Sequence, residues 1–342
     1  MMTAAEPAQT QQRREPPLVS VIIPVYQGEG IILGAVRSAL AQTHRNLEVF
    51  VVDDGSTDAT AAVLATIDDP RVRTLHQANA GTAAARNLAL AQARGEYISF
   101  LDSDDRWFPD KIETELHVLR NAPAPVAVAY SSYYPVDDRG RLLNLAPVHA
   151  DAGNVLDVLL DGEDYLMPSV CLFDRRIFDA LGPFNAGRYH EDHEFILRVS
   201  REFPVFPTRR RLTVYRQSTS GKCRAILNDY ARARSEELAL LDDLADVLTP
   251  DQSARLRRNV LRSLYYRFLM YGFNAHAKRV LPDVDQADLR GSRKGWLALL
   301  FAKTGINLMV VMRATIQAGY RLGRQRWWGR VLAASNVELF YG

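Results

Sequence analysis

Short apolar runs alternate with segments of helix-like spacing along the first part of the chain. The continuous run Val19–Tyr26 is typical of a strand buried on both faces, and such strands belong to parallel sheets. A helical pattern follows at Ile31–Gln42, and a second buried strand is expected at Leu47–Val52. The segment Asp58–Ile67 fits a helix for which Asp58 would be the N-cap. These segments predict one βαβ unit and its return helix.

The same pattern repeats over the next segment of the chain. A short strand is expected at 72–75, a helix at 81–93, and a strand at Tyr97–Leu101 that runs into Asp102. Repeated strand–helix units indicate an α/β fold with a doubly wound, mainly parallel sheet, whose ligands bind at the carboxyl ends of the strands. Three polar clusters directly follow predicted strands and should meet at one rim: Pro24–Tyr26, Asp53–Ser56 and Asp102–Asp105.

The remainder of the chain is less regular. A helix is expected at 110–121, an apolar run occupies 126–134, strand-like stretches continue to about 216, and helical periodicity dominates from Asn228. The N-terminal tail has no apolar segment, so it is interpreted as neither a signal peptide nor a membrane anchor. The predicted parts are a disordered tail at 1–17, a catalytic domain at 18–222 and a helical C-terminal extension at 223–342.

Composition and charge narrow the class of protein. The 342 residues are 47% apolar and 24% charged, values that exclude disordered and collagen-like chains. Cys171 and Cys223 lie far apart, with no metal-ligand or disulfide spacing, which fits a reducing cytoplasm. Residues 1–222 carry 23 basic against 29 acidic side chains, whereas 223–342 carry 19 against 11. The C-terminal region is therefore the basic one.

Three carboxylates stand close together after the predicted strand Tyr97–Leu101. Asp102, Asp104 and Asp105 would repel one another unless a cation or strong donors compensated them, and Mg²⁺ or Mn²⁺ shared with substrate phosphates is one solution. The alternative is that one aspartate caps the helix near Pro109 while the others are solvated. A lone D-x-D pair does not decide between these interpretations.

Other polar clusters also allow a structural and a functional interpretation. Asp53 and Asp54 precede ordinary turn residues, although a carboxylate at a strand end also suits a base or a ribose. Arg86, in a stretch of small residues that opens a helix, suits a phosphate, although surface arginines are common. Glu191 and Asp192 stand at a predicted helix start, where they either stabilise the helix dipole or supply a general base.

Taken together and in this order, the clusters resemble the family 2 glycosyltransferases, inverting enzymes with the GT-A fold. The resemblance extends from residue 18 to about 220. Its motifs are Val19–Tyr26, Ser38–Thr43, Val51–Asp58, Asn79–Asn87, Leu101–Asp105 with Trp107 and Pro109, Leu181–Phe184 and Glu191-Asp192.

The resemblance implies a nucleotide-diphospho-sugar donor and residues that bind it. Pro24 and Tyr26 would border the nucleobase pocket. Asp54, with Asp53, would bind the base, and Arg86 would lie near the base or the diphosphate.

The resemblance also assigns the reacting groups. Asp102 would touch the ribose, Asp104 would bind a Mn²⁺ or Mg²⁺ ion that bridges the diphosphate, and Asp192 would be the catalytic base. The implied reaction is a single in-line displacement, in which a deprotonated acceptor hydroxyl attacks the anomeric carbon.

One departure from the family pattern lies late in the domain. Many members carry a histidine shortly after a Tyr-Arg pair, whereas none follows Tyr215 and Arg216 at that place. Arg216 or Ser218 would then contact the diphosphate, and Asp105 and Glu191 are further candidates beside the principal acids. The motif of processive synthases is absent, which favours transfer of one sugar to a glycan or lipid-linked acceptor.

The C-terminal tail is strongly basic. Between Asp288 and Glu338 the sequence has nine basic residues and no acidic one, with apolar stretches and Trp327-Trp328 among them. Such a segment suits an anionic membrane surface, so we expect a cytoplasmic protein, peripheral on the inner face of the cell membrane through 289–330. The alternative is helices packed on the catalytic domain with a solvated basic face. Basic residues interrupt any spanning run, and no nucleic-acid-binding module accompanies the charge.

Three other functions compete with the transferase. A Rossmann NAD(P) oxidoreductase fits Gly28 and Gly30, which precede Asp53, but Gly34 falls one position late for G-x-G-x-x-G. A nucleotidyltransferase that makes nucleotide-sugars would show a Gly-rich loop bearing Lys or Arg after the first strand, which the sequence lacks. A non-enzymatic nucleotide-sugar binder would not need both a metal acid and a base. The transferase is the prediction, with a UDP-sugar favoured by the resemblance at Asp54.

Overall fold

The computed structural model describes most of the chain before residue 302. The described residues are 15–143, 147–162, 165–187, 190–217 and 226–285, with 289–290, 295, 298–299 and 301. The tail up to residue 14, Ser218, Cys223, the predicted boundary near 222 and most of the basic tail lie outside them.

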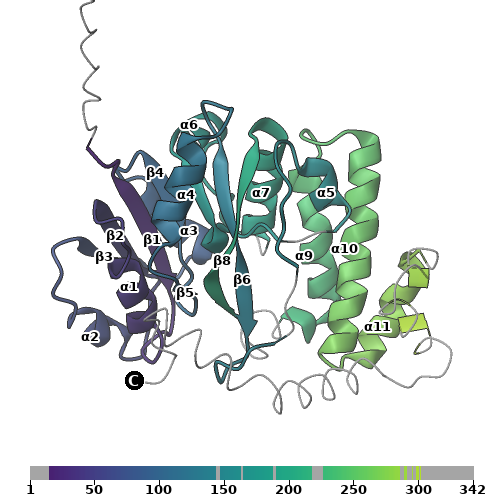
Figure 1. Cartoon of the computed structure of the whole chain (residues 1–342). Helices are drawn as coiled ribbons and strands as arrows, with labels where there is room; N and C mark the ends of the chain where they lie inside the picture. The colour runs from purple at the N-terminus through teal and green to yellow at the C-terminus, as the bar shows by residue number, and fades with distance from the viewer. Residues whose placement is uncertain are drawn as a thin grey trace, which may run out of the picture.

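An eight-stranded sheet forms the centre of the fold, with strand order β3-β2-β1-β4-β7-β6-β8-β5 (Figure 1). The pairs β1–β2, β2–β3, β1–β4 and β6–β8 are parallel, whereas β7 runs antiparallel to β4 and β6, and β5 antiparallel to β8. The expected α/β class with a mainly parallel sheet is confirmed. The strands are β1 Val19–Val25, β2 Leu47–Asp53, β3 Val72–His76, β4 Tyr97–Phe100, β5 Arg106–Trp107, β6 Val128–Val136, β7 Cys171–Asp174 and β8 Val205–Arg216.

Helices cover both faces of the sheet. Alternate residues of β1 point to opposite faces, so Val21 and Ile23 pack with α1, α2 and α4, while Ile22 packs on the face that carries α3 and α7. All seven residues of β1 and of β2 are buried, as their largely apolar composition predicts. The helices are α1 Ile32–Leu40, α2 Thr60–Leu64, α3 Thr82–Leu90, α4 Lys111–Arg120, α5 Leu156–Leu160, α6 Arg176–Leu181, α7 Glu191–Glu202, α9 Tyr230–Asp243, α10 Pro250–Met270 and α11 Asn274–Val280, with 3₁₀ turns η1 Pro168–Val170 and η2 Leu281–Asp283.

Two expectations from the sequence need correction. Helix α2 begins at Thr60 with Ala59 at the capping position, so Asp58 is not its N-cap. Instead the Asp58 carboxylate accepts hydrogen bonds from the Thr60 and Glu29 amides, at 3.0 and 3.2 Å, and ties two loops together. The strand-like region up to 216 also contains α5 and α6, because apolar runs this short do not distinguish a buried helix from a strand.

The helices that follow residue 226 pack against the α/β unit. Leu240 of α9 and Leu256 of α10 belong to the same buried cluster as Phe195 of α7. The Arg255 guanidinium forms an ion pair with Asp161 after α5, at 2.8 Å. Figure 1 shows α9 and α10 at the end of the molecule opposite α1 and α2. Among the described residues, no helix is long and apolar enough to cross a membrane.

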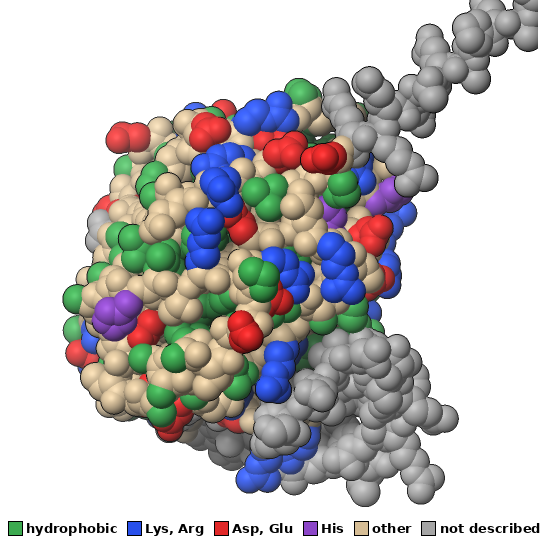
Figure 2. All heavy atoms as spheres, turned by 90° about the vertical axis from the view of Figure 1, so that its left-hand side faces the viewer, with side chains coloured by type: hydrophobic (Ala, Val, Ile, Leu, Met, Phe, Trp, Pro, Cys, Tyr) green, Lys and Arg blue, Asp and Glu red, His purple; other side chains and the backbone are tan. Residues whose placement is uncertain are grey.

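Strand β3 ends the sheet on one side. Its Arg73, Thr74 and His76 are exposed, and charged or polar side chains on an edge strand oppose pairing with another chain. Figure 2 views this side of the molecule and shows basic and acidic side chains interspersed over it, with hydrophobic ones scattered among them.

Candidate functional site

The carboxyl ends of β1, β2 and β4 meet at one rim of the sheet, as their polarity predicts. Val25 at the end of β1 pairs with Asp53 at the end of β2, and the Asp54 amide donates to the Val25 carbonyl at 2.9 Å. On the other side of β1, Ile22 pairs with Phe100, so the acids after β4 begin at the same edge. The rim is therefore the place where the chemistry of the site gathers.

The two acids after β2 are engaged within the protein. Asp53 is 2% exposed, and its carboxylate accepts the Ser56 amide at 2.9 Å and faces His76 at 3.1 Å. The Asp54 carboxylate accepts the amides of Ala80 and Gly81 at 2.8 and 2.9 Å. The bond to Ser56 fixes the turn after β2, and the bonds to Ala80 and Gly81 fix the loop between β3 and α3. A role in base binding stays a prediction for both acids.

The loop after β1 contains an exposed ring and a fixed turn. Tyr26 is 52% exposed and directly follows β1, whereas Pro24 is buried in that strand. Gln27, which the sequence analysis did not single out, has a φ of 52°, and its side-chain oxygen accepts the Thr57 and Asp58 amides at 3.0 Å each. The side chain of Gln27 thus fastens the loop after β1 to the loop after β2.

Arg86 lies beneath the rim, with 3% of its side chain exposed. It donates to Asp102 Oδ1 at 2.7 Å, and its Nη1 lies 3.9 Å from Glu191 Oε1. Burial acts to lower the pKa of the guanidinium, but the charges of Asp102, Asp192 and Glu191 outweigh it and raise the pKa. The Phe184 ring lies 5.3 Å from the guanidinium carbon. The structure thus joins the acids after β4 to the acids at the start of α7 through one buried cation.

The remaining acids after β4 are held in a poorly solvated environment. Burial, reinforced by the charge of Asp102, raises the pKa of Asp104 to about 6. Asp105 is fully buried; burial and the charge of Asp104 raise its pKa well above the ordinary value, while its Oδ1 accepts the Arg216 amide at 3.0 Å. The Arg216 amide and the Ser169 hydroxyl act to lower the pKa of Asp105, but they do not offset burial and the neighbouring negative charges. The charged form of Asp105 is therefore disfavoured here.

Two arginines border these acids. Arg106, which the sequence analysis missed, is buried and donates to the carbonyls of Asp105 and Ile31 at 2.6 and 2.9 Å. Burial lowers its pKa to about 10, against the attraction of Asp105 and Asp104. The guanidinium of Arg216 lies 3.4 Å from an Asp138 carboxylate oxygen, so Asp138 already engages the residue expected at the diphosphate. Only the position of Arg106, directly after the three acids, could have drawn attention to it.

Asp192 stands in the first turn of α7, as expected for a residue at a helix start. Its carboxylate accepts the His193 amide at 2.8 Å, and it contributes to the field at Arg86. Asp192, Glu191 and Asp102 thus share one buried cation, although α7 and β4 are far apart in the sequence.

A metal ion would need oxygen ligands that the site supplies only in part. Within the described ranges, no three His, Cys, Asp or Glu side chains are gathered as a metal-binding group. The carboxylates of Asp104 and Asp102 are hard oxygen donors, and burial, the main cause of the raised pKa of Asp104, disfavours its charged form unless a cation accompanies it. These residues fit an ion that takes its other ligands from a substrate diphosphate or water.

Curated relatives of the chain are glycosyltransferases. Residues 20–182 match the sequence profile of the family described as Glycosyl transferase family 2. An uncharacterized glycosyltransferase of Haemophilus influenzae is 34% identical over 190 residues, which cover 54% of this chain and 73% of that protein. One of Rickettsia conorii is 36% identical over 165 residues, or 47% of this chain and 27% of that protein. The Escherichia coli UDP-Glc:alpha-D-GlcNAc-diphosphoundecaprenol beta-1,3-glucosyltransferase WfaP is 42% identical over 118 residues, or 34% and 46%.

Two solved structures have a similar fold. S. aureus TarS 1-349 in complex with UDP-GlcNAc is 19% identical, with a TM-score of 0.58 over 89% of this chain and 92% of that one. The mannosyltransferase PcManGT from Pyrobaculum calidifontis, in complex with GDP-Man and Mn²⁺, is 17% identical, with a TM-score of 0.50 over 94% and 85%. The chain spans about a quarter of the R. conorii relative and less than half of WfaP. The profile match and the Haemophilus influenzae relative, covered over most of its length, place the chain in family 2 of the glycosyl transferases.

Proposed function

We propose that this protein transfers one sugar from a nucleotide-diphosphate donor to a hydroxyl of a glycan or lipid-linked acceptor, with inversion at the anomeric carbon. The observation that carries the proposal is the buried Arg86, which joins Asp102 at the end of β4 to Glu191 and Asp192 at the start of α7. A transferase needs donor-binding acids and a base on opposite sides of one reacting carbon. The junction at Arg86 brings residues of both kinds together.

The donor end of the proposed site is the rim formed by β1 and β2. Tyr26 offers an exposed ring on which a nucleobase can stack, and Asp54 holds the neighbouring Ala80–Gly81 backbone. A UDP-sugar is favoured, in keeping with the donor in the name of WfaP and with the UDP-GlcNAc bound in the TarS complex. Asp102 would contact the ribose, and Arg216 and Ser218 are the candidates near the diphosphate.

Asp104, with Asp102 or Asp105 beside it, would hold a Mn²⁺ or Mg²⁺ ion. The structure of PcManGT was determined with Mn²⁺ and a nucleotide-sugar, the chemistry proposed here. When bound, such an ion stabilises the negative charge of the departing diphosphate. The protein's own contribution is a set of adjoining carboxylates after β4, among which burial raises the pKa of Asp104 to about 6.

Asp192 is the proposed catalytic base. Its carboxylate would take the proton of the acceptor hydroxyl as that oxygen bonds to the anomeric carbon, while the bond from that carbon to the diphosphate oxygen breaks. The acceptor oxygen and the leaving oxygen occupy opposite faces of the carbon, which inverts its configuration. Glu191, 5% exposed beside Arg86, is the neighbouring acid and the second candidate for this role.

A panel of nucleotide-sugars with Mn²⁺ tests the proposal. One donor should raise the melting temperature of the protein and be hydrolysed slowly, and Asp192→Asn should abolish the turnover without preventing binding. Asp104→Ala should abolish both the Mn²⁺-dependent binding and the turnover. Glu202→Gln, a partly exposed acid at the other end of α7, is the control that should change neither. Binding of NADH in place of any nucleotide-sugar would refute the transferase.

Truncation of the basic tail tests the membrane contact proposed for residues 289–330. Leu289, Ala298 and Phe301 are fully buried in the cluster formed with α10 and α11, so a cut before them would expose that core. A chain that ends after Phe301 keeps the cluster and removes most of the basic tail. We expect this truncation to reduce sedimentation with vesicles that contain anionic lipid. Unchanged sedimentation would favour tail helices packed on the catalytic domain.

A further inference from the structure

Ser169 contacts the Asp102 side chain and backbone together. Ser169 lies in η1, just before β7, and is fully buried. Its hydroxyl donates to Asp102 Oδ2 at 3.1 Å and accepts the Asp102 amide at 3.2 Å. Because Arg86 donates to the other oxygen, Oδ1, both carboxylate oxygens of Asp102 are held by buried donors.

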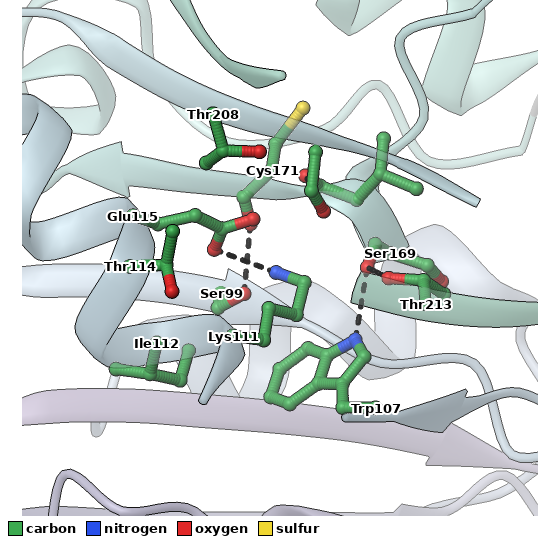
Figure 3. A network of polar contacts seen from close by, with 12 residues as sticks. Ser99, Trp107, Lys111, Ile112, Thr114, Glu115, Ser169, Cys171, Thr208 and Thr213 are labelled. Atoms are coloured by element: carbon green, nitrogen blue, oxygen red, sulfur yellow. Dashed lines mark hydrogen bonds and ion pairs between the residues drawn. The ribbon is translucent and has the colours of Figure 1, made fainter. Parts of the chain in front are cut away.

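The carbonyl of Ser169 is fixed from two further strands. Trp107 of β5 donates its indole N–H to this oxygen at 2.9 Å, and Thr213 of β8 donates its hydroxyl at 3.4 Å (Figure 3). Trp107 and Thr213 are paired across the two strands, and both are buried. The Ser169 peptide is therefore held independently of the hydroxyl that meets Asp102.

The Trp107 ring is itself held by a buried ion pair. The Lys111 ammonium lies 4.4 Å from the ring centroid and forms an ion pair of 2.7 Å with Glu115. Both side chains are fully buried, and a cation over an aromatic face is attracted more strongly when water is excluded. Figure 3 shows the ammonium directed at Glu115 and the indole nitrogen directed at Ser169. A continuous series of contacts thus leads from Glu115 and Lys111 of α4, through Trp107 and Ser169, to Asp102 at the rim.

We propose that Ser169 is a positioning residue that sets the orientation of the Asp102 carboxylate toward the donor, an inference that rests on the proposed function. The terminal torsion of an aspartate is soft, so one bonded oxygen leaves the carboxylate free to rock. Asp102 is about one third exposed, which gives it access to a ligand. With Arg86 on one oxygen and Ser169 on the other, the plane of the carboxylate is defined before the donor arrives.

Ser169→Ala, compared with Ser99→Ala, tests the inference. Ser99 is equally buried in β4, and its hydroxyl donates to the Cys171 carbonyl at 2.7 Å and not to Asp102. Ser169→Ala should raise the KM for the nucleotide-sugar and its Kd roughly tenfold, the effect of losing a hydrogen bond to a charged group, with a smaller change in kcat. Ser99→Ala should lower thermal stability and leave KM unchanged.

Thr213→Val provides a second variant of nearly equal volume. It removes the hydroxyl that reaches the Ser169 carbonyl and should raise KM in the same direction, roughly threefold. In a Ser169→Ala background it should have no further effect on KM, because its influence passes through Ser169. Additive effects, or an unchanged KM in Ser169→Ala, would overturn the inference. If the unaltered protein binds no nucleotide-sugar, the proposed function fails instead, and the two failures are thus distinguishable.

Discussion

The Arg86 guanidinium donates to Asp102 Oδ1 at 2.7 Å from a position in which only 3% of its side chain is exposed. Glu191 lies 3.9 Å from the other terminal nitrogen of the same guanidinium. The cation therefore compensates acids from two elements that approach each other only in the fold. A buried cation and its acids depend on one another, since removal of either leaves uncompensated charge away from water.

The first prediction concerns this junction. Arg86→Met should lower the free energy of unfolding by about 3 kcal/mol or more, because Asp102 and Glu191 lose their shared counter-charge. Arg86→Lys keeps the charge but lacks the planar guanidinium, so its decrease in unfolding free energy should be smaller than that of Arg86→Met. Urea unfolding measures both. Arg201→Met is the control, because Arg201 is 44% exposed beside the exposed Glu202 and its loss should cost less than about 1 kcal/mol. Equal losses in the Arg86 and Arg201 variants would contradict the prediction.

The first half of the fold was predictable because its signals are local. The runs that became β1 and β2 are apolar except for Ser20, Glu48 and Asp53, and such nearly continuous apolar runs are typical of strands buried on both faces. Strand polarity then placed Asp53 and Asp102 at one rim without any knowledge of distances. The pairing of β6 with β8 was not predictable in this way, because it joins segments distant in the sequence and contains register shifts.

The acidic residues of the site could be predicted from the sequence, but the hydrogen bonds that hold them could not. Ser169 and Arg106 carry no motif, and only the fold brings the first of them against Asp102. For Asp53 and Asp54 the sequence allows both a role in the turn and a role in base binding, and the structure shows that loop amides already bond both carboxylates. A short polar side chain looks the same in a sequence whether its partner is a ligand or a backbone amide.

The buried pair Lys111 and Glu115 gives the second prediction. Each side chain is fully buried, so loss of one partner leaves an unpaired charge in the interior. Above about pH 7, where the Glu115 carboxyl is ionised, Glu115→Leu and Lys111→Met should each cost about 3–5 kcal/mol in unfolding free energy, whereas the double variant should be close to neutral or more stable. Chemical denaturation of the four proteins completes the cycle. A double variant that loses the sum of the two single losses would contradict the prediction.

The same glutamate predicts a pH dependence of stability. Burial raises the pKa of Glu115 to about 7 from an ordinary value of 4.5. Between these values the folded protein keeps a proton that the unfolded chain has released, so this contribution to stability is complete below pH 4.5 and is lost as the pH rises through about 7. The loss should approach about 3 kcal/mol relative to the Lys111→Met/Glu115→Leu variant. The unfolding free energies of the unaltered protein and of the double variant should be measured between pH 4.5 and about 8. Taking their difference at each pH cancels the contribution of the other titratable groups. A difference that does not change with pH would contradict the assignment to Glu115.

Alanine substitutions at two glycines near the start of α1 distinguish the packing seen in this structure from the packing of a dinucleotide-binding loop. A Cβ at Gly34 would overlap the guanidinium of Arg106, whose side chain is buried and bonded to the Ile31 and Asp105 carbonyls. We expect Gly34→Ala to lower the free energy of unfolding by about 1–3 kcal/mol. Because alanine is the better helix former by about 1 kcal/mol, such a loss must come from the displacement of Arg106.

Because Arg106 lies against the acids after β4, Gly34→Ala should also raise the KM for the donor. Gly30→Ala is the matched control, since a Cβ there meets nothing within 4 Å, and it should change neither stability nor KM. A loop that cradles a dinucleotide would give the opposite order, with Gly30 sensitive because the pyrophosphate approaches its backbone. Thermal unfolding and donor titration of the two variants therefore test the packing of Arg106. The same comparison tests the alternative that the protein is an NAD(P) oxidoreductase.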